Sequence, residues 1–222
     1  AGSSPQGSRA CPRADSRHKR LTFSPLLYDP DSMTSVAIID YGMGNLHSIG
    51  KAVEHVAGDL RVSITADPAV IRRADRVIFP GVGAIRDCMH ELKRLELDAV
   101  VREIAGRKPL LGVCLGMQCI NEVFGGRTVK APLCVHGKTS AVHHNGKGLY
   151  EDVPNPFHGA RYHSLVVDRI PECLQLEAWT EGGVPMGIRH VSHPIVGVQF
   201  HPESFMTEPG DRILEHFLEG SF

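Results

Sequence analysis

The sequence lacks the features that mark several large classes of protein. Its 24 Lys and Arg nearly balance its 25 Asp and Glu, so the basic excess typical of nucleic-acid binding is missing. Runs of apolar residues stay far below the length that crosses a bilayer. The six cysteines form no C-x-x-C pair and no regular spacing, which argues against a disulfide framework. These absences predict a reduced, cytoplasmic protein with neither a nucleic-acid nor a membrane partner.

The first 32 residues differ in composition from the remainder. They are rich in Ser, Pro, Arg and Asp, show no helical or strand periodicity and lack the apolar core of a signal peptide. We expect residues 1–32 to be a disordered extension, either an expression segment or upstream translation, with Met33 as the natural start. Residues 33–222 are then expected to form one domain, which is long enough to bury a sizeable core.

Strand and helix signals alternate from residue 36 onward. Buried strands are expected at 36–40, 61–65, 76–79 and 109–113, and helical spacing at 45–56, 84–106 and 117–124. After Gly126 the pattern changes to short strands at 127–130, 163–167, 174–180, 186–190 and 195–200, followed by a helix at 211–218. This order predicts an α/β fold with a mixed, mostly parallel central sheet and helices on both faces.

The most informative stretch is PLLGVCLGMQ at residues 109–118. An apolar strand is interrupted by Gly112, reaches Cys114 and passes Gly116 into a helix. Small residues on either side allow the sharp turn of a nucleophile elbow, and the positive end of a helix favours a thiolate. Because free cysteine is often buried, an isolated Cys114 would more simply be a structural residue.

A second stretch, GVQFHPES at residues 197–204, changes that balance. An apolar strand ends at His201, and Glu203 follows two residues later. A histidine with a nearby carboxylate supplies a general base and a group that orients it. The pair favours a catalytic interpretation of Cys114.

Two glycine-containing turns also follow predicted strands. DYGMGN at 40–45 lacks the third glycine and the downstream acid of a dinucleotide site, so a tight turn at the active edge of the sheet is the better interpretation. PGVGA at 80–84 is by itself an ordinary strand-to-helix turn. Beside an elbow, its glycines would let backbone N–H groups point at a developing oxyanion.

The thirteen histidines do not predict a metal site. His143 and His144 are adjacent and point to opposite faces of a strand, while His136 and His163 have no accompanying ligand pattern. We therefore expect no metal.

The motifs G-V-C-L-G-x-Q at 112–118 and G-V-Q-F-H-P-E at 197–203 together resemble the triad-type, or class I, glutamine amidotransferases. The resemblance extends from about residue 36 to the end of the chain. It implies a flavodoxin-like fold, no cofactor, and hydrolysis of L-glutamine to glutamate and ammonia, which passes to a synthase subunit. It also implies that Cys114 is the nucleophile, that His201 transfers protons and that Glu203 orients His201.

The same resemblance implies the remaining site residues. The oxyanion donors would be the N–H groups of Val82 or Gly83 together with Leu115. The substrate would contact a set of residues from three segments: Gly81, Val82, Gly83, Gln118, Ser164 and Leu165.

The two halves of the chain resemble different members of the family. The motifs at 40–45 and 80–84 resemble the glutaminase subunit of imidazole glycerol phosphate synthase, whereas VHGKTS at 135–140, HHNGKG at 143–148 and RYHSL at 161–165 resemble component II of anthranilate or aminodeoxychorismate synthase. A chimera would explain this. We expect the synthase partner to be component I of the latter enzymes, and the cyclase subunit of imidazole glycerol phosphate synthase is the alternative. A catalytically silent synthase-binding module is a further alternative, which the intact Cys114, His201 and Glu203 argue against.

Overall fold

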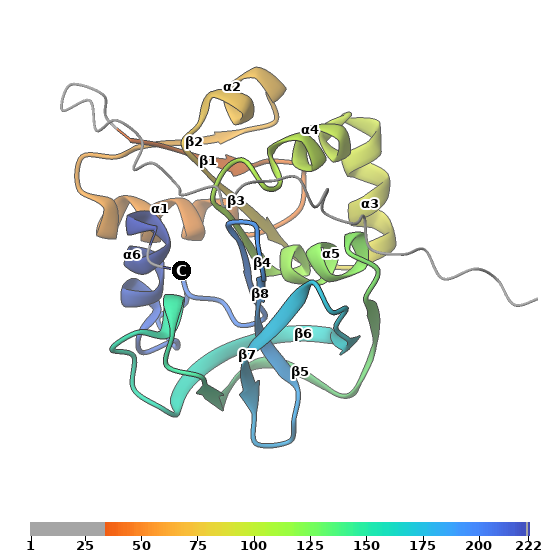
Figure 1. The fold of residues 1–222 in the computed structure, drawn as a ribbon, viewed down its shortest axis with the longest axis vertical. Helices are drawn as coiled ribbons and strands as arrows, with labels where there is room; N and C mark the ends of the chain where they lie inside the picture. Colours follow the sequence, from red (N-terminus) through yellow and green to blue (C-terminus); the bar gives the residue numbers. More distant parts are fainter. Residues whose placement is uncertain (1–33, 221) are drawn as a thin grey trace, which may run out of the picture.

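The computed structural model describes residues 34–220 and 222, apart from the side chains of residues 132 and 133. The expected extension at 1–32 lies outside these residues. A nine-stranded sheet runs through the described part in the order β2-β1-β3-β4-β9-β8-β7-β5-β6 (Figure 1). The strands are β1 (Ser35–Ile39), β2 (Arg61–Thr65), β3 (Arg76–Gly81), β4 (Leu110–Cys114), β5 (Arg127–His144), β6 (Phe157–Arg169), β7 (Leu174–Thr180), β8 (Pro185–His190) and β9 (Ile195–Val198).

The sheet has a parallel half and an antiparallel half. Strands β2, β1, β3, β4 and β9 pair in parallel. From β9 outward, β8, β7, β5 and β6 pair in antiparallel fashion. The predicted mixed α/β fold is therefore confirmed, and its parallel half carries the two predicted catalytic segments.

Helices cover both faces of the parallel half (Figure 1). They are α1 (Leu46–Ala57), α2 (Pro68–Arg73), α3 (Ile85–Arg94), α4 (Leu97–Ile104), α5 (Leu115–Val123) and α6 (Gly210–Glu219), with a short 3₁₀ turn, η1 (Gly148–Tyr150). One buried apolar cluster joins the sheet to α1 and α6, and a second joins the opposite face to α2, α3, α4 and α5. Because β1, β3 and β4 are covered on both faces, they are almost continuously apolar.

Local sequence explains where two of the helices begin. Asn45 accepts a hydrogen bond from the backbone N–H of Ser48 at 3.3 Å and so caps α1, as predicted. Asp67 caps α2 in the same way, through Ala69 N–H at 2.8 Å, and Pro68 occupies the first turn. The sequence pattern did not predict α2 because six residues are too few to show a helical period.

The strands after residue 126 differ most from expectation. The predicted strand at 127–130 is the beginning of the 18-residue β5, and the one at 163–167 is the middle of the 13-residue β6. The pairing of β5 with β6 shifts register between Lys130 and Val135 and again between His136 and Lys138. These irregularities break the alternation of apolar and polar residues on which strand prediction depends. β9 ends at Val198, two residues before the predicted end.

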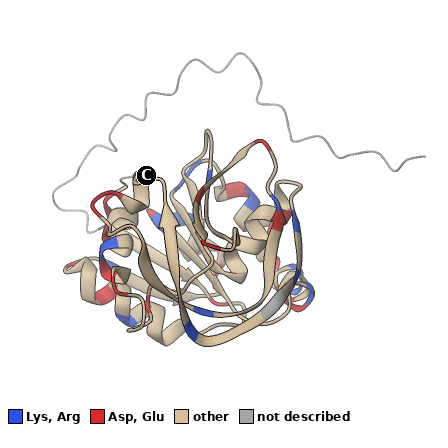
Figure 2. Ribbon diagram, turned by 90° about the horizontal axis from the view of Figure 1, so that it is seen from below, with Lys and Arg blue, Asp and Glu red and all other residues tan. Residues whose placement is uncertain are grey.

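The carboxyl ends of β1, β3, β4 and β9 meet at one edge of the parallel half, which is where ligands bind in open α/β sheets. Charges of both signs are interspersed over the described residues (Figure 2). None of the described helices is long and apolar enough to cross a membrane.

Candidate active site

Cys114 lies on a sharp turn between β4 and α5. Its backbone has φ 55° and ψ −104°, a conformation that is strained for any residue with a side chain. The turn depends on the two flanking glycines. A Cβ atom on Gly116 would lie 1.9 Å from the carbonyl oxygen of Phe79, and one on Gly112 would lie 2.8 Å from the backbone nitrogen of Met117. The sequence G-V-C-L-G therefore builds a nucleophile elbow.

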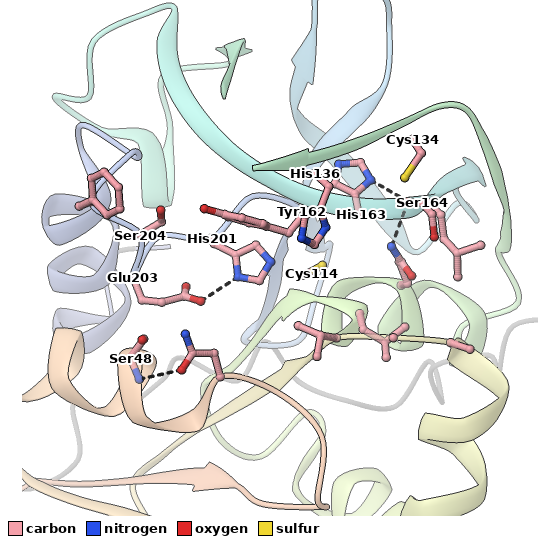
Figure 3. Close-up of a pocket in the computed structure, with 18 residues that line it drawn as sticks. Ser48, Cys114, Cys134, His136, Tyr162, His163, Ser164, His201, Glu203 and Ser204 are labelled. Carbon is pink, nitrogen blue, oxygen red and sulfur yellow. Dashed lines mark hydrogen bonds and ion pairs between the residues drawn. The ribbon is translucent and has the colours of Figure 1, made fainter. Parts of the chain in front are cut away.

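His201 and Glu203 lie beyond the end of the neighbouring strand, β9. The Nδ1 atom of His201 is 2.7 Å from Oε1 of Glu203, and both side chains are more than nine-tenths buried (Figure 3). The backbone holds the imidazole in place, because His201 N–H donates to Ala160 O at 3.1 Å and Thr207 Oγ1 donates to His201 O at 2.7 Å. Nδ1 is therefore committed to Glu203, and Nε2 is the ring nitrogen left for chemistry.

The electrostatics favour a protonated His201. Burial opposes the charge, but the interactions with Cys114 and Glu203 outweigh it and raise the pKa of His201 to about 10. Nε2 makes no hydrogen bond of ordinary length with the described residues. Cys114 nevertheless lies beside the imidazole (Figure 3), close enough for the two groups to interact. A thiol, an imidazole and a carboxylate thus form one contiguous cluster.

A cavity of about 710 Å³ opens in front of this cluster (Figure 3). Val82 and Gly83, which follow β3, lie on its wall together with Leu115. Gly83 has φ +99°, a conformation that glycine adopts without strain. The three residues expected to supply oxyanion donors are thus brought to the same cavity as Cys114.

Gly81 does not line the cavity and belongs to the support behind it. A Cβ atom there would lie 2.2 Å from the Tyr41 hydroxyl, which donates to Pro80 O at 2.9 Å. The lack of a side chain at Gly81 therefore allows the fully buried Tyr41 to pack against the segment that leads to Val82. This places the turn after β1 at the active edge, as the sequence suggested.

The expected substrate residues Gln118, Ser164 and Leu165 also line the cavity. Gln118 Nε2 donates to the Leu165 carbonyl at 3.2 Å. Its Oε1 atom is buried and has no partner among the described residues, so it is available to accept a hydrogen bond from a ligand.

Arg161 and His163 support the Leu165 carbonyl, a role that the sequence did not indicate. His163 Nδ1 lies 2.8 Å from the Leu165 carbonyl, which can only accept, so Nδ1 carries the proton. Its Nε2 then accepts from Arg161 Nε at 3.0 Å. Burial, together with the nearby Arg161 charge and despite the Leu165 hydrogen bond, lowers the pKa of His163 to about 4. A neutral His163 therefore fixes the direction of the Leu165 carbonyl.

Tyr162 and Gln199 are two further site residues that the sequence did not single out. The Tyr162 ring meets the His201 ring edge to face, with centroids 5.3 Å apart (Figure 3). Gln199 is fully buried, and its Nε2 atom lies 3.5 Å from Cys114 Sγ. Both residues stand inside the motifs RYHSL and GVQFHPES, but their contacts depend on strand register, which the sequence does not show.

The histidines considered as metal ligands have separate roles in the described structure. His144 stacks on Tyr150 and bonds the Pro154 carbonyl at 3.0 Å, whereas His136 packs edge to face against Tyr162. Among the described residues, no group of three or more His, Cys, Asp or Glu side chains is arranged to hold a metal ion.

The fold and site define an α/β protein in which a strained elbow cysteine lies beside a buried histidine–glutamate pair, and the three groups share one cavity. Residues 37–220 match the family model for class-I glutamine amidotransferases, and the chain belongs to this family.

Three curated relatives represent the branches that the sequence suggested. The chain is 50% identical to anthranilate synthase component 2 of Thermus thermophilus over 123 residues, which are 54% of this chain and 60% of that protein. It is 44% identical to aminodeoxychorismate synthase component 2 of Escherichia coli over 155 residues, 69% of this chain and 80% of that protein. It is 42% identical to the imidazole glycerol phosphate synthase subunit HisH of Nitrosococcus oceani over 206 residues, 84% of this chain and 97% of that protein.

The chain spans less than two thirds of some relatives. It covers 60% of the Thermus protein and 32% of the bifunctional protein TrpGD of Thermotoga maritima, to which it is 41% identical. A solved structure of a GMP synthase protein from Thermoplasma acidophilum superposes with a TM-score of 0.75 at 21% identity, covering 86% of this chain and 94% of that chain. That likeness supports the fold alone.

Proposed function

We propose that this chain is a glutaminase subunit that hydrolyses glutamine through a thioester on Cys114 and passes ammonia to a synthase partner. The observation that carries the proposal is the elbow: Cys114 is held in a strained conformation beside the buried His201–Glu203 pair, at the mouth of a cavity. Such strain costs stability and is typical of functional sites. Membership of the class-I family supports the same substrate.

The chemistry proceeds in two halves. The Cys114 thiolate attacks the side-chain amide carbon of glutamine, and the negative charge moves to the amide oxygen. The N–H groups of Leu115 and of Val82 or Gly83 stabilise that oxyanion. His201 Nε2–H protonates the departing nitrogen, so ammonia leaves and a glutamyl thioester remains. His201 then takes a proton from water, the hydroxide adds to the thioester, and the Cys114 thiolate leaves as glutamate forms.

Glu203 and Gln118 have supporting roles in this proposal. Glu203 binds Nδ1–H of His201 and keeps Nε2 directed toward the reacting atoms. The Oε1 atom of Gln118, which has no hydrogen-bond partner among the described residues, accepts a hydrogen bond from glutamine, and the Ser164–Leu165 backbone faces the same ligand. Because a thiol nucleophile must stay reduced, we place the reaction in the cytoplasm.

We infer that the synthase partner is component I of anthranilate or aminodeoxychorismate synthase. The higher identity to the component 2 relatives, 50% and 44%, supports this choice, as does the RYHSL motif, whose residues 162–165 line the cavity. A partnership with the cyclase subunit of imidazole glycerol phosphate synthase is the second candidate, because the HisH relative is matched over 97% of its length.

The test is glutamate release from glutamine by the purified chain, first without a partner and then with each candidate synthase in a separate reaction, with Cys114→Ser as the blank. Stimulation by component I of anthranilate or aminodeoxychorismate synthase is the expected result, and stimulation by only the cyclase of the histidine-type enzyme would assign the chain to the second candidate. If no reaction gives turnover above the blank, with or without a partner, the glutaminase proposal fails.

A further inference from the structure

Gln199 occupies an unusual position for an amide side chain. It directly follows β9, and the register of β4 and β9 pairs Val113 with Val198, so Gln199 stands next to Cys114 across the strand pair. Its exposed fraction is 0%. Both the oxygen and the NH₂ group of a buried amide need hydrogen-bond partners. A buried polar group without a partner costs more stability than a typical hydrogen bond contributes.

The hydrogen bonds around Gln199 fix which way its amide points. The Leu165 carbonyl can only accept, so Gln118 presents its NH₂ group there, at 3.2 Å. The same NH₂ group lies 3.0 Å from Gln199, which must therefore offer its oxygen, Oε1. The NH₂ group of Gln199 is left on the other side, where Nε2 lies 3.5 Å from Cys114 Sγ. The chain of acceptors and donors thus ends with an N–H directed at the sulfur.

We propose that Gln199 is a catalytic residue that donates a hydrogen bond to the sulfur of Cys114 whenever that sulfur is a thiolate. The proposal rests on the function proposed above, in which Cys114 is the nucleophile. The donor keeps its proton throughout and forms no covalent bond.

The reaction contains two thiolate states that such a donor would favour. One precedes attack on glutamine, and the other arises when the thioester breaks and Cys114 departs. A hydrogen bond to a charged acceptor is stronger than one to a neutral acceptor, so the donor stabilises both states relative to the neutral thiol. Because Gln118 orients Gln199 and also lines the cavity, the donor is held by the same side chain that faces the substrate.

A purely structural role predicts different behaviour. If Gln199 only filled space and satisfied Gln118, its loss would lower stability or weaken glutamine binding without changing the pH dependence of Cys114 reactivity. The decisive readout is therefore the pH profile of Cys114 alkylation by iodoacetamide, followed by mass spectrometry of the peptide that contains Cys114.

The test compares Gln199→Met, which keeps the length of the side chain and removes the donor, with the wild-type chain. We expect alkylation of Cys114 at neutral pH to slow about tenfold and its pH midpoint to rise by about one unit, the order expected for a lost hydrogen bond to a charged group. The kcat for glutamine should fall by a similar factor of about ten, while KM changes by less than about threefold. Gln175→Met makes the same chemical change on the exposed side of β7 and should leave all three readouts unchanged.

A second variant keeps the proposal falsifiable if Gln199→Met does not fold. Gln199→Glu preserves the acceptor for Gln118 and replaces the donor with an acceptor beside the sulfur, so it should suppress neutral-pH alkylation more strongly. A folded variant of either kind with a wild-type alkylation profile and kcat would overturn the proposal. Retained turnover in Cys114→Ser would instead show that the proposed function itself is wrong.

Discussion

Cys114 and His201 come from the ends of two adjacent parallel strands, β4 and β9, whose register pairs Val113 with Val198. The pairing places a strained thiol beside an imidazole whose other nitrogen is held by Glu203 at 2.7 Å. A segment before α5 and a segment after β9, some 87 positions apart in the numbering of Cys114 and His201, therefore form one reactive cluster. Single substitutions can separate the groups that react in this cluster from those that hold it in place.

The first prediction concerns the nucleophile. Cys114→Ser should abolish detectable glutamate release because a serine hydroxyl has no comparable anionic form at neutral pH. Circular dichroism should show an intact fold. Cys119→Ser makes the same change one turn further along α5, outside the cavity, and should retain turnover. Turnover in Cys114→Ser that matches the Cys119→Ser control would remove Cys114 from the mechanism.

The second prediction concerns the raised pKa of His201. Its folded-state value of about 10 exceeds the ordinary 6.5, so protonated His201 stabilises the folded state fully below pH 6.5. That contribution is lost as pH rises from 6.5 through about 10. Replacing Glu203 by Gln removes a negative partner and moves the folded-state pKa back toward its ordinary value. The free energy of unfolding should therefore fall less steeply with pH across this window in Glu203→Gln than in the wild-type chain.

Urea unfolding at several pH values measures this slope. Glu208→Gln is the matched control, because Glu208 lies 3.4 Å from His158 in a pair that is exposed to solvent, and it should keep the wild-type slope. Identical slopes for Glu203→Gln and the wild-type chain would contradict the assigned electrostatics.

The third prediction concerns the support behind the substrate wall. His163→Leu removes the donor to the Leu165 carbonyl and the acceptor for Arg161 Nε. We expect KM for glutamine to rise about tenfold, because the loss of the hydrogen bond that orients the Leu165 carbonyl weakens glutamine binding by about the free energy of one hydrogen bond. The kcat should change little. His158→Leu, an exposed position on the same strand, should leave KM unchanged. A larger effect on kcat than on KM would assign His163 to the chemical step instead.

The candidate reactive groups could be proposed from the sequence because they depend on local rules, and the structure brings Cys114, His201 and Glu203 to one cavity. Two glycines, a cysteine and a strand-to-helix transition are enough to indicate the elbow, and His201 with Glu203 is a local pair. The parallel half of the sheet was likewise visible as alternating buried strands and helices. These features depend on residues close together in the chain.

Features that depend on register were not predictable. Gln199 contacts Cys114 only because β9 pairs with β4, and His163 reaches the site only because β6 runs beside β5. The full length of β5 was missed because its register shifts interrupt the two-residue period. The contact of Gly81 with the substrate stays a prediction, and its close packing against the Tyr41 hydroxyl is a detail that a motif does not contain.

The fourth prediction concerns the geometry of the elbow. Gly116→Ala would place a methyl group 1.9 Å from the backbone oxygen of Phe79, which cannot be relieved by moving a flexible side chain. We expect a loss of stability of about 1–3 kcal/mol or more, as for overpacked cores, together with loss of turnover. Gly182→Ala has its nearest neighbour at 3.9 Å and should be tolerated. Thermal unfolding of both variants provides the comparison, and equal midpoints would show that the elbow is not tightly packed.

The fifth prediction concerns the rim of the cavity. Phe205 follows the triad segment, lines the cavity and is 96% exposed, more than any other exposed large hydrophobic side chain in the described part of the chain. If the synthase covers this rim, Phe205→Ala should reduce the ratio of stimulated to unstimulated turnover by about tenfold or more, as for an aromatic hot spot. Val191→Ala, an exposed apolar residue in the turn that precedes β9, is the control. An unchanged ratio would place the partner elsewhere.

The most direct test of the central claim is to trap the covalent intermediate. The chain is mixed with glutamine and the most stimulating synthase, quenched in acid during turnover, digested and analysed by mass spectrometry. We predict a glutamyl group on the peptide that contains Cys114, and its loss in Cys114→Ser. Glutamate release without any such adduct, or an adduct on another residue, would contradict the mechanism.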